Sequence, residues 1–201
     1  MRFGLSAAVA YHKSPQADRF AAENKSERRH KAMISEGKDS QPGVAMDKDL
    51  EFMNQAIRLA RMARDRGNTP VGSVVVCPGG IVAEGMEAVR SEKDLTAHAE
   101  VKAVREACRL LDSLDLTGCT LYTTAEPCFM CSYVIRSARI SRVVTGRGVP
   151  NVGGISSNHP ILTDPEIPNW PRPPAVVTGV LLAECSALFQ PKLIAIGRSR
   201  D

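Results

Sequence analysis

The sequence predicts an α/β domain: a three-layer α/β/α sandwich in which helices cover both faces of a mixed, roughly five-stranded sheet. The first observation is the order of the patterns, in which a helix, two antiparallel strands, and then strand and helix units follow one another. The second is a set of short β-branched runs bounded by Gly and Pro, which are typical of strands. The third is the composition, because 43% hydrophobic and 24% charged residues are ordinary for a soluble globular protein.

Apolar periodicity predicts the individual elements. A first helix is expected over residues 47–66, because Leu50, Met53 and Ile57 recur at helical spacing and Gly67 can end it. Further helices are expected over residues 96–111, 128–138 and 180–189. Strands are expected over residues 72–76, 81–86, 119–124, 142–145 and 176–178. Loops should join them at residues 90–94 and over the Pro- and Gly-rich stretch 146–174.

The chain divides into three parts by composition. Residues 1–45 contain few apolar side chains after Val9 and are expected to be a disordered N-terminal extension. A targeting arm is the alternative, but its apolar run is short and acidic residues such as Asp18 are present. Residues 46–190 carry the periodic patterns of one folded domain. A short basic tail, residues 191–201, follows.

Charge and cysteine content limit the partners and the compartment. The net charge of +4 is too small to establish a nucleic-acid partner, and no apolar run is long enough to span a membrane. The chain is too large to need a disulfide scaffold. Four of its six cysteines are therefore expected to be buried thiols: Cys77, Cys108, Cys119 and Cys185. This predicts a reducing, cytoplasmic location.

Two short motifs carry potential metal ligands. His98 and Glu100 stand in a Thr-Ala-His-Ala-Glu run, and Cys128 and Cys131 stand in Glu-Pro-Cys-Phe-Met-Cys. A lone Cys-x-x-Cys can also be a redox pair, a structural zinc knuckle or two buried thiols. One His and two Cys, however, supply three zinc ligands and leave the fourth position for water, as in catalytic zinc sites. We therefore expect one catalytic zinc ion per chain.

The predicted helices place both motifs at helix N-termini. Thr96 is the expected cap of the helix that carries His98 and Glu100, and Cys128 begins the next helix. The free amides and the positive end of a helix dipole favour thiolate and hydroxide. Together, His-x-Glu and Pro-Cys-x-x-Cys form the signature of zinc-dependent nucleobase deaminases, in which the Glu carries protons and is not a ligand.

Over about residues 47–189 the chain resembles the cytidine-deaminase-like superfamily, in the branch that holds bacterial guanine deaminases and tRNA adenosine deaminases. The resemblance is carried by residues 70–72, 96–100, 105–108, 118–123 and 126–131. It implies a zinc-dependent deaminase domain over residues 46–190, with His98, Cys128 and Cys131 on zinc and Glu100 as the catalytic proton carrier. In this branch an Asn that contacts the base usually ends the second strand, and here Glu87 takes its place. The usual Arg-Asp pair after the fourth strand is replaced by residues 148–150.

These departures favour a free nucleobase or nucleoside as the substrate, with a guanine-type purine preferred. The alternatives are a tRNA-specific adenosine deaminase that makes inosine and a non-catalytic zinc-binding protein; Glu100 argues against the latter. The candidate substrate-binding residues are Val71, Glu87, Ala99, Asn151 and His159. Glu87 is equally well explained as a solvated charge at the end of a strand. The family resemblance and the apolar girth of helix 128–138 also predict a homodimer.

Overall fold

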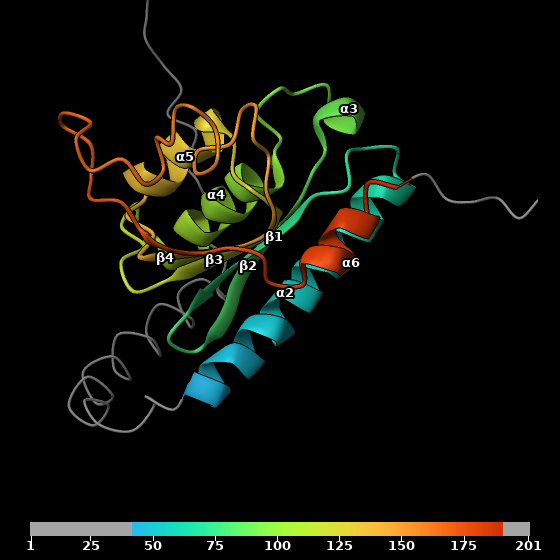
Figure 1. Ribbon diagram of the computed structural model, residues 1–201, viewed down its shortest axis with the longest axis horizontal. Coiled ribbons are helices and arrows are strands. Elements are labelled where there is room, and N and C mark those ends of the chain that lie inside the picture. Colours follow the sequence, from blue (N-terminus) through green and yellow to red (C-terminus); the bar gives the residue numbers. More distant parts are fainter. Residues whose placement is uncertain (1–41, 191–201) are drawn as a thin grey trace, which may run out of the picture.

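The computed structural model describes residues 42–190, which form a mixed five-stranded sheet between two layers of helices (Figure 1). The fold predicted from the sequence is confirmed. Most of the predicted N-terminal extension (residues 1–41) and the tail (191–201) lie outside the described residues. Among the described helices, none has the length and apolar character needed to cross a membrane.

The sheet contains β1 (Gly72–Cys77), β2 (Gly80–Met86), β3 (Thr120–Ala125), β4 (Arg142–Arg147) and β5 (Ala175–Val177). Their order across the sheet is β2-β1-β3-β4-β5. Strand β1 pairs antiparallel with both β2 and β3, whereas β4 pairs parallel with β3 and β5. The carboxyl ends of β3 and β4 therefore meet at one edge of the sheet, where ligands bind in open α/β folds.

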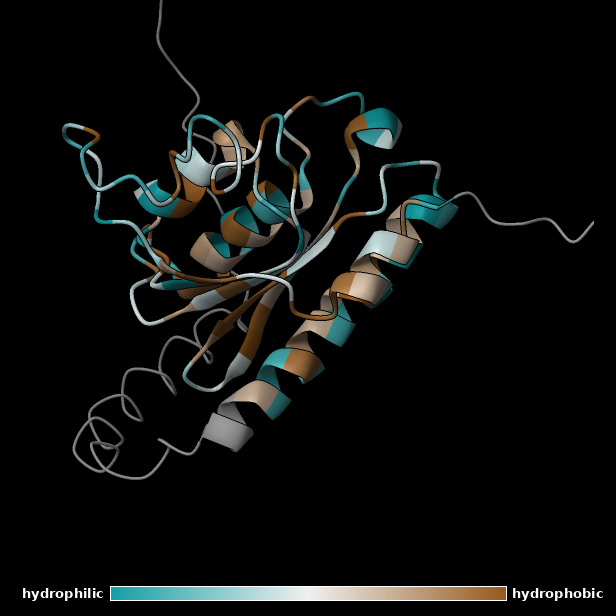
Figure 2. Cartoon of the chain, viewed as in Figure 1, coloured by the Kyte–Doolittle hydropathy of each residue, from teal (hydrophilic) through white to brown (hydrophobic). Residues whose placement is uncertain are grey.

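The helices are α2 (Pro42–Asp65), α3 (Val89–Glu92), α4 (Ala99–Leu111), α5 (Phe129–Ser137) and α6 (Leu182–Ala187). Helices α2 and α6 cover one face of the sheet, and α4 and α5 cover the other (Figure 1). Alternation along the strands supplies a core to each face. In Figure 2 the helices are banded in brown and teal, as expected for amphipathic helices that pack on a sheet.

The two cores lie on opposite faces of the sheet. Toward α2 and α6, the buried side chains of Val74, Tyr122 and Val144 pack with Met53 and Cys185. The neighbouring residue in each strand points to the other face: Val75 in β1, Leu121 in β3 and Val143 in β4. The core beneath α4 and α5 is built from buried residues of the strands and of both helices: Val75, Leu121, Val143, Val104 and Ile135. A strand buried on both faces has the continuous apolar runs seen in the sequence.

A glycine fixes the position of α4 on the sheet. A Cβ atom at Gly85 in β2 would collide with the carbonyl oxygen of Ala99 and the amide nitrogen of Ala103. The helix can lie this close because residue 85 has no side chain and both facing residues are alanines. This contact sets where the first turn of α4, with His98 and Glu100, lies above the sheet.

Some predicted boundaries were wrong. Helix α2 begins at Pro42 and not at residue 47, and α6 is shorter than the predicted helix 180–189. Residue 98, not Thr96, is the N-cap of α4, because the Thr96 hydroxyl and amide both donate to Asp94. The predicted loop 90–94 overlaps the short helix α3. Buried Asn68 explains that helix, since its Oδ1 accepts hydrogen bonds from the amides of Arg90 and Ser91.

A disulfide joins Cys77 and Cys119, which the sequence analysis expected to be free thiols. The reason is the register of β1 on β3. Val76 pairs with Thr120, so the next position along β1 lies opposite Cys119. Directly opposed residues on antiparallel strands are close enough to be bridged. Cys108 and Cys185 are free, as predicted; the first is half-buried and the second is buried.

Candidate metal centre and catalytic cavity

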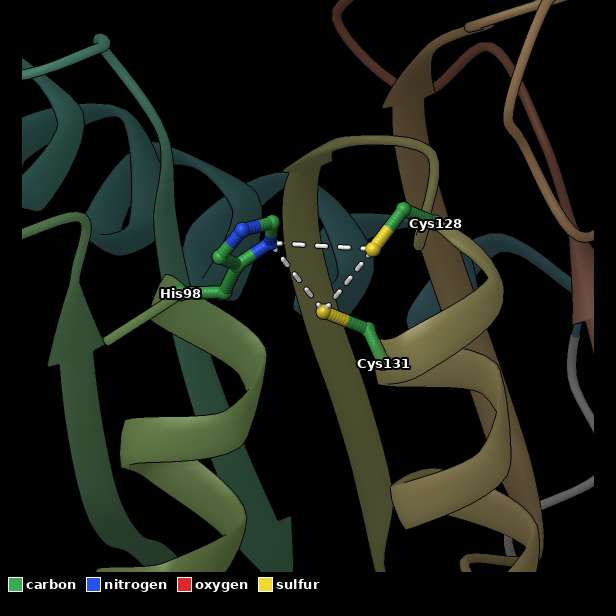
Figure 3. A group of neighbouring side chains, drawn as sticks. All are labelled: His98, Cys128 and Cys131. Atoms are coloured by element: carbon green, nitrogen blue, oxygen red, sulfur yellow. Dashed lines mark hydrogen bonds between the residues drawn. The ribbon is translucent and has the colours of Figure 1, made fainter. Parts of the chain in front are cut away.

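His98, Cys128 and Cys131 direct their donor atoms toward one another (Figure 3). Nδ1 of His98 lies 3.7 Å from Sγ of Cys128 and 3.5 Å from Sγ of Cys131, and the two sulfurs are 3.6 Å apart. In a tetrahedral zinc site, with Zn–S of about 2.3 Å and Zn–N of about 2.0–2.1 Å, donor atoms lie about 3.5–3.8 Å from one another. The three side chains therefore fit a zinc ion without rearrangement.

The donor set leaves one coordination position open. Within residues 42–190, His98, Cys128 and Cys131 are the one group of three His, Cys, Asp or Glu side chains close enough to share an ion. Structural zinc sites normally have four protein ligands, whereas catalytic sites have three ligands and a water. The geometry is that of a catalytic site.

Helix N-termini hold two of the three donors. His98 is the N-cap of α4 and Cys128 is the N-cap of α5, and both have extended backbone angles. Their carbonyl oxygens accept the first helical hydrogen bonds, from Lys102 and Ser132 respectively. Cys131 lies in the first turn of α5, three residues after Cys128, so both sulfurs share one side of that helix. The helix dipole there favours thiolate.

The donor side chains also bind protons, which a metal must displace. Hydrogen bonding with Cys128 raises the pKa of His98 to about 9. Hydrogen bonding with Cys131 lowers the pKa of Cys128 to about 4, and the same contact raises the pKa of Cys131 above its ordinary value. One of the two sulfurs is therefore a ready thiolate at neutral pH.

Glu100 lies beside the donors in the first turn of α4. Its side chain is almost fully buried, and its carboxyl group hydrogen-bonds with the Cys131 thiol. Burial raises the pKa of the Glu100 carboxyl to about 7. A carboxyl group with such a pKa can both accept and release a proton at neutral pH.

A cavity of about 340 Å³ opens next to the metal donors. Its walls include His98, Cys128 and Glu100, so a bound molecule can reach all three. This volume falls within the range of small-molecule sites. The cavity lies at the carboxyl ends of β3 and β4, where Ala125 and Arg147 form part of the lining.

Two of the predicted substrate-binding residues, Val71 and Glu87, line this cavity. Glu87 is only 7% exposed, which rules out a solvated charge at the end of a strand. Burial raises the pKa of its carboxyl group, while His98 and the backbone amides of Val89 and Ala99 act in the opposite direction. Ala99 is itself buried and contributes its amide to Glu87.

Asn151 and His159, the other predicted substrate-binding residues, are exposed and do not line the cavity. The ring of His159 instead lies 6.3 Å from that of Phe129. A role of Asn151 or His159 in substrate binding therefore stays a prediction. The loop contributes Val149 and Val152 to the cavity wall.

Sequence reasoning also missed several residues that line the cavity: Thr69, Val89, Arg90, Arg147 and Phe189. The guanidinium group of Arg147 lies 4.2 Å above the ring of Phe189, in a cation–π contact. Both arginines lie in predicted loops, where an isolated basic residue gives no distinctive signal. Their association with the cavity depends on contacts between distant parts of the chain.

Comparison with known families adds a second line of support. Residues 46–147 match the model of the cytidine and deoxycytidylate deaminase zinc-binding region. The chain belongs to this deaminase family. Members use a zinc ion held by His and Cys residues for hydrolytic deamination, so the family and the donor geometry agree on the metal.

Individual deaminases resemble the chain over most of their length. The tRNA-specific adenosine deaminase of Aquifex aeolicus is 39% identical over 136 residues, which are 66% of this chain and 90% of that protein. A solved structure from a study of A-to-I editing by tRNA:A34 deaminases has a TM-score of 0.65 and 35% identity, and the match covers 69% of this chain and 98% of that one.

A structure of the guanine deaminase of Nitrosomonas europaea has a TM-score of 0.56, and the match covers 92% of this chain and 97% of that one. Its identity to this chain is 21%, so the likeness supports the fold alone.

Proposed function

We propose that the protein is a zinc-dependent hydrolytic deaminase whose substrate is an adenosine in tRNA, converted to inosine. The observation that carries the deaminase chemistry is the buried Glu100 carboxyl, which lines the same cavity as two of the metal donors, His98 and Cys128. The similarity to tRNA-specific adenosine deaminases over nearly their whole length supports the substrate. The sequence alone favoured a free purine.

The reaction assigns a task to each residue of the site. His98, Cys128 and Cys131 would hold the zinc ion, and zinc supplies a bound water whose pKa is lowered from ~15.7 to ~7. Glu100 accepts one proton from water and gives it to the ring nitrogen. It then accepts the second proton of that water and gives it to the leaving amine, which departs as ammonia. Such positioned proton transfer contributes about 10²- to 10⁴-fold to a rate. The buried position of Glu100 keeps bulk water from competing for that proton.

Two arginines support a polynucleotide substrate. Arg90 from α3 and Arg147 from the end of β4 both line the cavity, and Phe189 beside Arg147 offers an exposed ring. Cationic and aromatic groups next to a base pocket suit a base whose neighbours carry phosphates. Binding through such contacts weakens as salt concentration rises.

A free purine base rich in N–H donors, such as guanine, is the second candidate, and Glu87 favours it. The Glu87 carboxylate is an acceptor-only group in the cavity wall, so it suits a ring that presents several N–H groups. Guanine has such donors on its amine and ring nitrogens, and adenine has fewer.

The test is to give the purified protein a tRNA anticodon stem-loop, free purines and nucleosides, and to measure inosine in the RNA and ammonia release. Inosine in the RNA, with turnover that falls at higher salt, is the expected result. The double variant Arg90→Ala/Arg147→Ala should then lose RNA turnover. Ammonia from guanine without inosine in RNA would establish the second candidate, and Glu87→Asn should then weaken guanine turnover.

A further inference from the structure

Glu126 is a buried carboxylate that the proposed proton transfer does not use. It is 5% exposed and stands two residues before Cys128, at the end of β3. Four donors from one loop contact it. Oε1 accepts hydrogen bonds from the amides of Ile155 and Ser156, each at 2.6 Å; Oε2 accepts from the amide of Val149 at 2.8 Å and from the Ser156 hydroxyl at 2.5 Å.

The same loop is bound along the residues that follow Glu126. The amide of Gly154 donates to the carbonyl of Pro127 at 2.8 Å, and Gly153 forms an antiparallel bridge with Cys128. A Cβ atom at Gly153 would collide with the Glu126 carboxylate, so this close approach requires glycine. Residues 149–156 are therefore attached to the segment that delivers a metal donor.

We propose that Glu126 is a positioning residue that holds the loop 149–156 against Pro127 and Cys128, and thereby fixes the Cys128 sulfur and the cavity wall. The first turn of α5 holds the backbone of Cys128 on one side, through the hydrogen bond from Ser132. The bridge to Gly153 holds it on the other side. Without Glu126, four donors of the loop lose their acceptor, and the bridge loses its anchor.

The chemistry requires a carboxylate at this position. Each oxygen of Glu126 faces two donors, and a carboxylate is the side-chain group that accepts at both oxygens without donating. In a Gln side chain one of the two positions becomes an NH₂ group. That group would face either the amides of Ile155 and Ser156 or the amide of Val149, so at least one of these amides would lose its hydrogen bond.

The decisive experiment uses the metal itself. Wild type, Glu126→Gln and the control Glu106→Gln are loaded with Co²⁺, and metal transfer to a chelator is followed well below the unfolding temperature. Glu106 is a suitable control because its carboxylate pairs with Arg109 within α4 and does not line the cavity. We expect transfer from Glu126→Gln to be about 10- to 100-fold faster, with an altered cobalt absorption spectrum, because groups that orient metal ligands have effects of this size.

A lowered melting temperature with an unchanged transfer rate and spectrum would overturn the proposal, because Glu126 would then act on stability alone. If Glu126→Gln does not fold, Ser156→Ala decides. It removes one of the four hydrogen bonds and should accelerate transfer several-fold; a wild-type rate would overturn the proposal. Neither readout involves a substrate, so these results stand apart from the test of tRNA deamination.

Discussion

Glu87 and Glu100 are two of the three buried carboxylates that line the cavity, the third being Glu126, and their surroundings set their roles. Glu87 is hydrogen-bonded by backbone amides, an arrangement that suits an ionised acceptor. Glu100 is more completely desolvated, and this burial, together with the nearby negative charge of Cys128, raises its pKa and favours the protonated form. Their different surroundings thus suit Glu87 to binding a base and Glu100 to moving a proton.

Replacing Glu100 by Ala should abolish turnover while the metal remains bound. The expected fall in activity is about 10²-fold or more, because a positioned proton carrier is lost. The zinc content should stay near one ion per chain, since the three donors are on other residues. Elemental analysis together with ammonia release checks this, and loss of zinc or near-normal turnover would contradict the role of Glu100.

Zinc binding should release protons and should weaken as the pH falls. The pKa of His98 is raised to about 9 and that of Cys131 is raised further, so both hold a proton at neutral pH, whereas Cys128, with a pKa of about 4, does not. Metal ligands must be deprotonated, so binding at pH 7 should displace about two protons. Calorimetry in buffers of different ionisation enthalpy measures this number. A value near zero would contradict the proton sharing described above.

At the scale of elements, the long loop after β4 is fixed by two buried charged residues. Glu126 holds residues 149–156, as described above. Arg136 in α5, which is 1% exposed, holds the later part of the loop through hydrogen bonds to the carbonyls of Ile161, Asp164 and Pro171. Trp170 lies against its guanidinium group. A loop with few apolar residues is thus ordered by charge-assisted hydrogen bonds.

Replacing Arg136 by Lys should therefore lower the stability of the protein. Lys has one nitrogen and cannot reproduce the planar fork that reaches three carbonyls, so buried acceptors lose their partners. A loss of about 2 kcal/mol or more in the free energy of unfolding is expected, since hydrogen bonds to charged groups are worth about 1.5–3 kcal/mol each. Denaturant unfolding measures it. The exposed Arg105→Lys in α4 is the control and should have wild-type stability.

The disulfide between β1 and β3 should also contribute to stability. It closes a loop with a sequence separation of 42 residues, for which chain entropy gives about 4 kcal/mol. A reductant should therefore lower the melting temperature of the wild type but not that of Cys77→Ala/Cys119→Ala. Equal melting temperatures for oxidised and reduced wild type would show that the bond contributes nothing.

The sequence predicted what local patterns determine. The strands, most helices and the fold class follow from periodicity, and the three zinc ligands follow from motif spacing. The sequence analysis missed the disulfide, the hydrogen bonds that Asn68 accepts from amides of α3, and the cavity arginines. Each of these depends on strand register or on contacts between distant segments, which local patterns do not contain. The predicted Thr96 cap failed because Asp94 competes for the same hydroxyl.

At the scale of the whole molecule, the outer side of α5 remains partly open. Tyr133 is 55% exposed on this helix, although Trp170 from the long loop packs against its ring. The homodimer expected from the sequence would bury this surface. The dimer stays a prediction.

Light scattering at micromolar concentration should show a dimer, and Tyr133→Lys should shift the protein toward the monomer. Leu114→Lys is the matched control, because Leu114 is 81% exposed in the turn after α4 and does not belong to α5. A monomeric wild type, or an equal effect of both substitutions, would contradict a dimer formed through α5.

The separation of the interior into two apolar cores means that stability and catalysis can be altered independently. His98, Cys128 and Cys131 belong to the layer of α4 and α5, whereas the core beneath α2 and α6 contains no metal donor. Adaptation to a hotter or colder environment can therefore proceed through substitutions at residues such as Met53 and Val144, with the catalytic layer unchanged. A laboratory that wants a more robust enzyme has the same freedom: it can repack the α2 side and then select for substrate on the other.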